Sequence, residues 1–256
     1  MMWEIYDVLI SSADSDIRIK DFAAGTYWTA VMTEDGILGL SPSIHERYQR
    51  FPFGIEPAAG MTAGEMAPGL KSWNYVEASI AMAAVNACFN RPDRIPEDAV
   101  VYPGGRRSRG AFSKFCETHT KDRHTLFSEL MYERDELQNI PGIIDILRRD
   151  EDRTYRDYLY TAYRELMPSC DQLIVSGKSF VSKLAGPMIR LAGETGKKTL
   201  LWGMDIPLCP ELLRAGISHI TGFIVDDPEE CFRLVKRGGT RDDIIRCGHF
   251  VSIEKQ

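Results

Sequence analysis

Two stretches in the first third of the chain decide the fold. One is DFAAGTYWTAVMTEDGILGLSPS, residues Asp21–Ser43, and the other is SWNYVEASIAMAAVNACFN, residues Ser72–Asn90. In the first, β-branched and aromatic residues on both sides of Glu34–Gly36 predict a hairpin of two strands. In the second, Asn74 is a suitable N-cap for an alanine-rich helix over Tyr75–Phe89. Because its side chains are small, this helix is expected to lie close against the strands.

The residues around these stretches complete a small α+β unit. A helix is predicted over Trp3–Ala13 and a further strand over Ile17–Phe22. Phe51–Gly69 is rich in Gly, Ala and Pro and has no periodicity, which predicts a long loop of the kind that often serves function. We expect this loop to act as a lid. Three prolines and paired glycines within Arg91–Gly110 place a domain boundary there.

The second half of the chain alternates strand and helix patterns. Strands are predicted at Ala111–Phe115, Thr125–Tyr132, Gln172–Val175, Lys198–Trp202 and His219–Ile224, and helices at Asp152–Leu166, Ser179–Ala192, Cys209–Ala215 and Pro228–Arg237. The segment Thr125–Tyr132 is also compatible with a helix. Alternation of this kind is typical of a parallel sheet with helices on both faces.

Composition excludes several classes of protein. The chain has 256 residues and a net charge of −6, with scattered basic residues, which argues against nucleic acid as the main partner. No apolar run has the 18 or more residues of a membrane-spanning helix. The first ten residues carry acids and no basic segment, so no signal peptide is predicted and a cytoplasmic location is expected. Six single cysteines without a CxxC pair indicate reduced thiols.

The segment Ser176-Gly177-Lys178-Ser179 stands between a predicted strand and a predicted helix. It is not a phosphate-binding P-loop, because Gln172 occupies the position of the first glycine of that motif. A turn that opens a helix presents free N–H groups and the positive end of the helix dipole. An anion, or the carboxylates of a chelating ligand, could therefore bind there. A plain turn in which Ser179 is the N-cap explains the same residues.

Two further strand ends and one helix start carry acidic side chains. Asp205, in the turn that begins at Gly203, could bind a metal or a hydroxyl, or could cap the helix near Pro210. Asp226 is a further candidate, although Asp-Asp-Pro is also a common helix start. Glu77 either projects into a cleft between domains or forms a capping box with the N-cap residue.

Cysteine and histidine pairs are weaker metal candidates. Cys116 and His119 lie three residues apart with His124 beyond them, Cys247 lies two residues before His249, and Cys209 lies in a proline-rich turn. None of them has the paired spacing of a zinc finger or ribbon. They are interpreted as buried thiols and surface imidazoles.

The order and spacing of several segments resemble a prokaryotic family labelled putative heavy-metal chelation. The matching segments are Gly25–Val31, Gly39-Leu40, Ser72–Asn74, Glu77–Ser79 with Ala84 and Asn86, Asp171–Gly177, the pair Gly203 and Pro207, and the set Gly216, Gly222 and Asp226. The resemblance implies an enolase-N-terminal-like α+β cap domain over residues 1–95, followed by a Rossmann-like α/β domain over residues 105–256. It also implies a ligand site between the two.

Two segments depart from this family. Phe112–Glu117 lacks the glycine of a turn that usually follows the first strand of the second domain. Ser179–Leu184 lacks the usual Asn and Thr at the start of the next helix, and the departure is concentrated in Ser182–Leu184. If these positions contact the family's ligand, this chain is expected to bind a different ligand or to bind it less tightly.

The sequence thus predicts binding of a small anionic or metal-chelating ligand between the domains, with a role in heavy-metal handling. The alternative is an enzyme that uses the same cleft, with a carboxylate as acid or base or with a Mg²⁺-type metal; an eroded scaffold is a third hypothesis. The predicted ligand-binding residues are Asn74, Glu77, Ser176, Gly177, Ser179, Gly203, Asp205 and Asp226. Because these are mostly oxygen donors, a bare metal bound there should be a hard divalent cation. The implied cofactor is a divalent metal or a metal chelate, no nucleic-acid or membrane partner is expected, and assembly into a homo-oligomer is left open.

Overall fold

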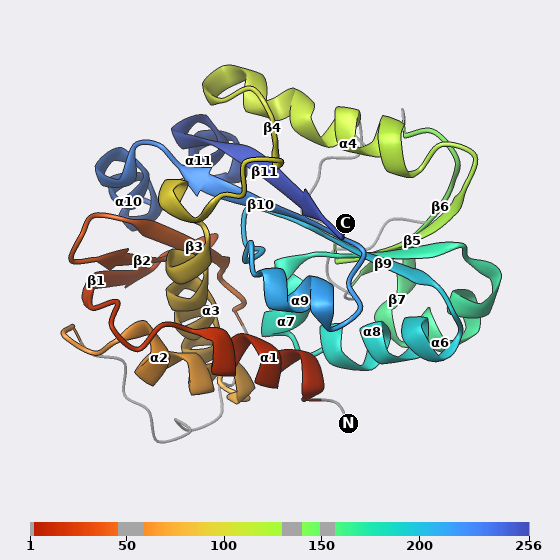
Figure 1. Cartoon of the computed structure of the whole chain (residues 1–256), viewed down its shortest axis with the longest axis horizontal. Coiled ribbons are helices and arrows are strands. Elements are labelled where there is room, and N and C mark those ends of the chain that lie inside the picture. The colour runs from red at the N-terminus through yellow and green to blue at the C-terminus, as the bar shows by residue number, and fades with distance from the viewer. Residues whose placement is uncertain (1–2, 46–58, 130–139, 149–156, 256) are drawn as a thin grey trace.

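The computed structural model describes residues 3–45, 59–129, 140–148 and 157–255, which form two β-sheets and the helices around them (Figure 1). The smaller sheet is antiparallel and consists of β1 (Ile19–Ala24), β2 (Trp28–Thr33) and β3 (Leu38–Pro42) in that order. The predicted meander and its turn are confirmed.

The larger sheet contains eight strands. Their order across the sheet is β4 (Val100–Val101), β11 (Gly248–Glu254), β10 (His219–Val225), β9 (Lys198–Trp202), β8 (Gln172–Val175), β5 (His124–Ser128), β6 (Ile143–Arg148) and β7 (Asp157–Leu159). The strands from β10 to β7 are parallel, whereas β11 is antiparallel to β10 and β4 is antiparallel to β11. The α/β fold with a parallel sheet is therefore confirmed.

Helices cover both faces of the large sheet. They are α1 (Glu4–Ser12), α2 (Ala63–Met66), α3 (Tyr75–Phe89), α4 (Ala111–His119), α6 (Tyr163–Leu166), α7 (Gly177–Val181), α8 (Ala185–Glu194), α9 (Pro210–Arg214), α10 (Pro228–Lys236) and α11 (Arg241–Ile244). Successive strand residues point to opposite faces, so Leu173 packs in the core with α1, α3, α8 and α9, whereas Ile174 packs in the core with α4, α10 and α11. Figure 1 shows α4 on one side of the sheet and α7–α9 on the other.

Several boundary predictions were wrong. Ala111–Phe115 is the start of α4 and not a strand, because Ala111, Phe112, Phe115 and Cys116 form one buried helical stripe. Asp157–Leu159 is the edge strand β7, so the described helical part of the predicted helix Asp152–Leu166 is the 3₁₀-helix Tyr160–Ala162 followed by α6. Residues 152–156 lie outside the described residues.

The predicted helix Ser179–Ala192 is interrupted. It forms α7 and α8, which are separated at Ser182–Leu184, where Lys183 has a positive φ of 68°. Strand β5 ends at Ser128, and residues 130–132 of the predicted strand lie outside the described residues.

The loop prediction for Phe51–Gly69 was also wrong in its described part. Residues 59 and 60 form a turn, α2 follows, and Ala67–Lys71 is a 3₁₀-helix. The cause is a capping box in which Thr62 and Glu65 satisfy each other's backbone N–H groups. The lid hypothesis for residues 51–58 lies outside the described residues.

Helix α3 is almost entirely buried and contacts both sheets. Every residue from Glu77 to Phe89 is buried, as expected for a helix that is apolar or small on all sides. A Cβ at Gly39 in β3 would lie 2.9 Å from Cα of Ala87 and closer still to the carbonyl oxygen of Ala83. The predicted close approach of helix and strands is confirmed, because the backbones of α3 and β3 are in direct contact at Gly39.

Two buried asparagines bind the loop after β9: Asn86 lies within α3, and Asn90 directly follows that helix. Asn86 Nδ2 donates to the carbonyls of Leu40 (2.7 Å) and Asp205 (3.0 Å). Asn90 Nδ2 donates to the carbonyls of Ile206 and Phe223, and its Oδ1 accepts from the Leu208 N–H at 2.8 Å. These bonds fix α3 relative to the large sheet, and they confirm the interpretation of Asn86 as a structural amide.

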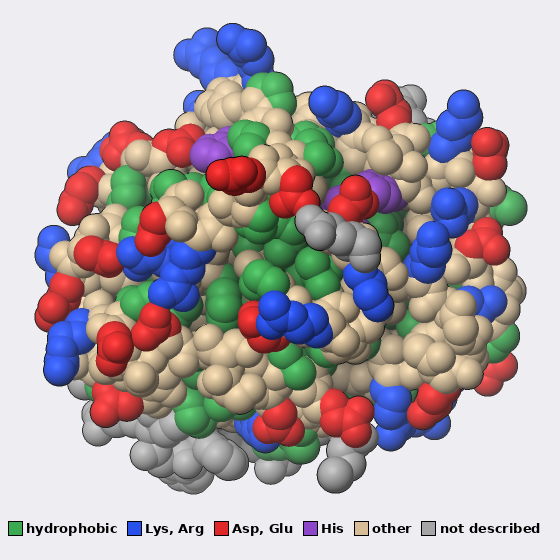
Figure 2. All heavy atoms as spheres, in the orientation of Figure 1, with side chains coloured by type: hydrophobic (Ala, Val, Ile, Leu, Met, Phe, Trp, Pro, Cys, Tyr) green, Lys and Arg blue, Asp and Glu red, His purple; other side chains and the backbone are tan. Residues whose placement is uncertain are grey.

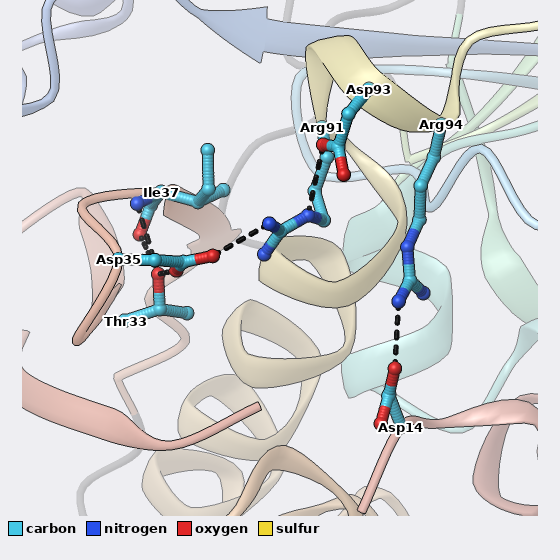
Figure 3. A network of polar contacts seen from close by, with 7 residues as sticks. All are labelled: Asp14, Thr33, Asp35, Ile37, Arg91, Asp93 and Arg94. Atoms are coloured by element: carbon cyan, nitrogen blue, oxygen red, sulfur yellow. Dashed lines mark hydrogen bonds and ion pairs between the residues drawn. The ribbon is translucent and has the colours of Figure 1, made fainter. Parts of the chain in front are cut away.

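Ion pairs at the surface hold the chain that follows α3 (Figure 3). The Arg91 guanidinium donates to Asp35 at 2.6 Å and to Asp93 at 3.1 Å, and Arg94 donates to Asp14 at 2.7 Å. Thr33 Oγ1 also donates to the Asp35 carboxylate. The pairs therefore join the β2–β3 turn and the end of α1 to the same short segment.

The surface face in Figure 2 shows acidic and basic side chains interspersed, with hydrophobic side chains gathered near its centre. Among the described residues no helix has the length and apolar character needed to cross a bilayer. All six cysteines are buried free thiols, as predicted.

We expect Gly39→Ala to lower the free energy of unfolding by about 1–3 kcal/mol, the usual cost of extra atoms in a packed core. The added methyl group would meet backbone atoms of Ala83 and Ala87, which cannot rotate away. Gly193→Ala in α8 is the matched control, because a Cβ there meets nothing within 4 Å. Urea unfolding measures the free energy of unfolding of both variants. Equal values for Gly39→Ala and Gly193→Ala would show that α3 can move away from β3 without loss of stability.

A second prediction concerns pH. The hydrogen bond from Arg91 lowers the pKa of Asp35, so this pair contributes stability above the ordinary carboxyl range and loses it as the pH falls through the folded-state pKa. Asp35→Asn should cost about 0.2–1 kcal/mol at pH 7. The difference in free energy of unfolding between Asp35→Asn and the unmodified chain should shrink below about pH 4. Unfolding curves at several pH values test this, and a pH-independent difference would exclude an ionic contribution.

Candidate functional site

The predicted residues of the second half lie where neighbouring parallel strands end. Ser176 follows β8, Gly203 follows β9 and Asp226 follows β10. Because the strands are parallel, these positions share the carboxyl edge of the large sheet, which is where open α/β sheets usually bind ligands.

Asp205 is placed against the turn that the sequence predicted as an anion site. Its side chain is 3% exposed, and the backbone N–H groups of Gly177 and Lys178 donate to it. A Cβ at Gly177 would lie 2.6 Å from Asp205 Oδ2, so glycine is needed for this contact. Burial raises the pKa of Asp205 to about 6, although hydrogen bonds from its own backbone N–H and from those of Gly177 and Lys178 act in the opposite direction. The N–H groups of this turn therefore already have an anionic acceptor from the chain itself.

Four buried hydroxyls form what we call the serine cluster: Ser128, Ser176, Ser179 and Ser182. Ser128 ends β5, and the other three lie in or beside α7, which follows the neighbouring strand β8. Ser179 Oγ is hydrogen-bonded to Ser128 Oγ, and Ser176 Oγ donates to the carbonyl of Glu129 at 3.0 Å. The cluster joins two adjacent strand ends.

Two charged residues of this region were missed by the sequence prediction. Glu129 and Lys183 are each 3% exposed, and charged side chains are rarely buried to this degree. Both have left-handed backbone, with φ of 48° and 68°, which is uncommon for residues other than glycine and concentrates at functional sites. The only signal in the sequence was the family departure at Ser182–Leu184. Glu129 had been placed within the predicted strand Thr125–Tyr132.

The contacts of these two residues differ. Glu129 Oε2 accepts from Ser182 Oγ at 2.6 Å. Lys183 Nζ donates to the carbonyl of Val181 at 3.0 Å and lies 5.9 Å from the centre of the Tyr6 ring. Burial lowers the pKa of Lys183 to about 7. The region thus contains a buried carboxylate, Glu129, and a buried amine, Lys183, whose pKa allows both protonation states near neutral pH.

Tyr6 brings α1 into the same region. Its hydroxyl donates to the carbonyl of Phe180 at 3.0 Å. Burial raises the pKa of Tyr6, and the charges of Glu129 and Tyr75 add to this effect. Since Tyr75 is the first residue of α3, the start of α3 lies near the serine cluster.

Asn74 and Glu77 lie at this helix start. Asn74 Oδ1 accepts from the N–H groups of Val76 and Glu77, so the predicted N-cap is confirmed. The Ser72 hydroxyl accepts from the Asn74 N–H at 3.0 Å and donates to Glu77 Oε2 at 2.6 Å. Glu77 is buried at 7% exposure. A site shared by Glu77 with the turns at Ser176 and Asp205 stays a prediction.

The remaining acidic candidate, Asp226, is exposed and lies 2.9 Å from His249 Nδ1. Asp227, not Asp226, is the N-cap of α10 and accepts from the Glu230 N–H. Asp226 is thus at the predicted edge but two strands away from the serine cluster, about 10 Å at the usual strand spacing.

The soft-ligand candidates of the sequence make contacts of other kinds. His119 packs on His219 with ring centres 4.3 Å apart, burial raises the pKa of Cys116, and Cys209 donates to Glu211 at 3.2 Å. Within the described ranges, one group of three potential metal ligands lies together, and it consists of His124, Asp145 and Cys170. A hollow of about 540 Å³ lies along α10 and contains none of the predicted site residues; its lining residues are Glu229, Glu230, Phe232, Arg233, Lys236 and Arg237.

Two solved structures have the same fold over nearly the whole chain. A protein of unknown function from the DUF364 family of Desulfitobacterium hafniense is 27% identical, with a TM-score of 0.81 over 99% of this chain and 98% of its own. A second member of that family, from Pyrococcus horikoshii, is 19% identical, with a TM-score of 0.76 over 100% of both chains, and shows the fold alone.

Two family models match the sequence, and both are described as putative heavy-metal chelation. The DUF4213 model covers residues 6–89, and the DUF364 model covers residues 127–252. No curated protein matches the chain. The resemblance found in the sequence is confirmed, and the chain belongs to the family described as putative heavy-metal chelation.

Proposed function

We propose that the protein binds a small anionic, metal-chelating ligand at the serine cluster and thereby handles a heavy metal as a metal–ligand complex. One observation carries this proposal: a buried carboxylate, Glu129, a buried amine, Lys183, and four buried hydroxyls all lie at or shortly after the ends of β5 and β8 in the chain. Convergent polar groups at the carboxyl edge of a parallel sheet are the usual composition of a small-molecule site.

Lys183 is the group that would attract the anion. An ammonium has three N–H donors, and its hydrogen bond among the described residues is to the Val181 carbonyl. A buried cation is costly unless it is paired. An anionic ligand would therefore be stabilised by Lys183 and would in turn keep it protonated.

The other groups supply oxygen. Glu129 and the serine hydroxyls could coordinate or hydrogen-bond the ligand, while Asp205 holds the turn at Gly177 in place. Oxygen donors favour hard divalent cations, so a softer metal would arrive inside a chelate. Ser176 and Ser179 belong to the serine cluster itself, and Asn74, Glu77, Gly203 and Asp226 remain the proposed outer contacts. Six buried free thiols fit a reducing compartment, and we place the protein in the cytoplasm.

The protonation of Lys183 can be tested in the protein without ligand. Its folded-state pKa of about 7 lies below the ordinary 10.5, so between these values the unfolded chain binds more protons and stability rises with pH. Between these two pKa values, the free energy of unfolding of the unmodified chain should rise with pH by up to about 1.4 kcal/mol per pH unit more than that of Lys183→Met. Lys20→Met, at an exposed position on β1, should show no such dependence. Parallel stability curves for the two variants would mean that Lys183 titrates normally.

A binding prediction tests the proposal itself. Calorimetric titration with nickel citrate should show binding that weakens at least about tenfold in Lys183→Met, the factor that corresponds to about 1.4 kcal/mol. Affinity should also fall as the pH rises above about 7, where the ammonium is lost. Lys20→Met should bind as the unmodified chain does. Equal affinity in all three proteins would place the anion elsewhere.

An enzyme that uses the same residues is the second candidate. Asp205, with a pKa of about 6, and Lys183, with a pKa of about 7, both lie in the range useful for proton transfer at neutral pH. Metal analysis of the purified protein separates the two functions. A stoichiometric transition metal supports chelation, whereas turnover that depends on Mg²⁺ supports the enzyme.

A further inference from the structure

A second group of potential ligands lies at the opposite edge of the large sheet. His124 is the first residue of β5, Asp145 lies in the neighbouring strand β6, and Cys170 lies just before β8. Their ligand atoms all lie within 4.8 Å of one another. Since β5 ends at Ser128, this group is separated from the serine cluster by the length of the strand, about 13 Å.

Hydrogen bonds fix the orientation of His124. Its Nδ1 lies 3.0 Å from the Ser169 carbonyl, and its backbone N–H donates to Asp171 Oδ2 at 2.8 Å. A ring whose Nδ1–H donates to a carbonyl presents Nε2 as the ligand atom, which is the usual arrangement around metal-binding histidines.

The position of Asp145 makes a cation useful at this point. His124 Nε2 lies 2.8 Å from Asp145 Oδ2. Both ring nitrogens of His124 thus face oxygen acceptors. Each nitrogen can donate a hydrogen bond to its acceptor only when the ring carries a proton on both nitrogens. A metal ion that binds Nε2 and the carboxylate would take the place of one of those protons.

Cys170 adds a sulfur ligand. Its side chain is buried at 1% exposure, whereas the side chains of His124 and Asp145 are 22% and 17% exposed. Burial, followed by the nearby Asp145 charge, raises the pKa of Cys170 to about 11, so the thiol keeps its proton in the metal-free protein. A bound cation attracts the negative charge of the thiolate, so it would offset both effects and favour the deprotonated form.

We infer that His124, Asp145 and Cys170 bind a divalent transition-metal ion of the Zn²⁺ class. One nitrogen, one sulfur and one carboxylate ligand suit Zn²⁺ or Co²⁺ better than Mg²⁺ or Ca²⁺, which prefer oxygen alone. Three protein ligands leave a fourth tetrahedral position for water or for a donor from a small molecule. This site would bind a bare metal ion, in contrast to the chelate proposed at the serine cluster.

Titration of the chelator-treated protein with Co²⁺ tests the site. We expect saturation at one Co²⁺ per chain, with tetrahedral d–d absorption and a thiolate-to-cobalt charge-transfer band that Zn²⁺ removes by competition. Cys170→Ser should abolish the charge-transfer band. Asp145→Asn, which keeps the shape of a half-buried side chain, should weaken Co²⁺ binding by about tenfold or more and leave the band at saturation.

Two control variants assign the signal. Cys247→Ser removes the partner of Cys231, with which it shares a thiol hydrogen bond, and Lys183→Met alters the site proposed for the chelate. Both should keep the charge-transfer band. A band that persists in Cys170→Ser would show that another thiol is the ligand, and a band that disappears in Cys247→Ser would assign the metal to the Cys231/Cys247 pair; either result overturns the inference. Absence of the band from the unmodified chain at saturating Co²⁺ would also overturn it. Lys183→Met should leave the cobalt signal intact while it weakens binding of nickel citrate. The two measurements therefore test the two proposed sites separately.

Discussion

The backbone contact between α3 and β3 at Gly39 is the constraint on which the rest of the structure depends. It allows a helix buried from Glu77 to Phe89 to lie directly on the small sheet. The same helix reaches the large sheet through the side-chain amides of Asn86 and Asn90. Because those amides bond backbone atoms of residues 205–208, the position of α3 determines the position of the loop that carries Asp205. Helix α3 therefore links the small sheet to the carboxyl edge of the large one.

The carboxyl edge combines strongly polar groups with near-complete burial. Asp205, Glu129 and Lys183 are each about as exposed as core hydrophobic residues. Charged groups in such surroundings need hydrogen-bond partners, which the Gly177 turn supplies for Asp205 and Ser182 supplies for Glu129. Left-handed backbone at Glu129 and Lys183 adds a local conformational cost. The stability of the core formed by α3 and α8 is what allows this edge to keep such groups in place.

Local patterns in the sequence were sufficient for most of the fold but not for the centre of the site. The hairpin, α3 and strands β8 to β10 follow from periodicity and caps, which act over a few residues. Ala111–Phe115 was misassigned because five residues are too few to separate a helical stripe from a strand. Glu129 and Lys183 were missed because their significance lies in burial and backbone geometry, which depend on contacts between strands far apart in sequence. His124, Asp145 and Cys170 were likewise brought together by strand order, since the separations of 21 and 25 residues between successive ligands match no metal motif.

The contact between Asp205 and the Gly177 turn has a consequence for competition among anions. The carboxylate that occupies the N–H groups there is tethered to the chain, so its effective concentration at the turn is high, typically millimolar or above for groups joined by a short connection. Simple cellular anions at lower concentration cannot displace it. The turn is thereby shielded from common small carboxylates and phosphates, and discrimination among ligands is left to groups such as Lys183 that have no tethered anion of their own among the described contacts.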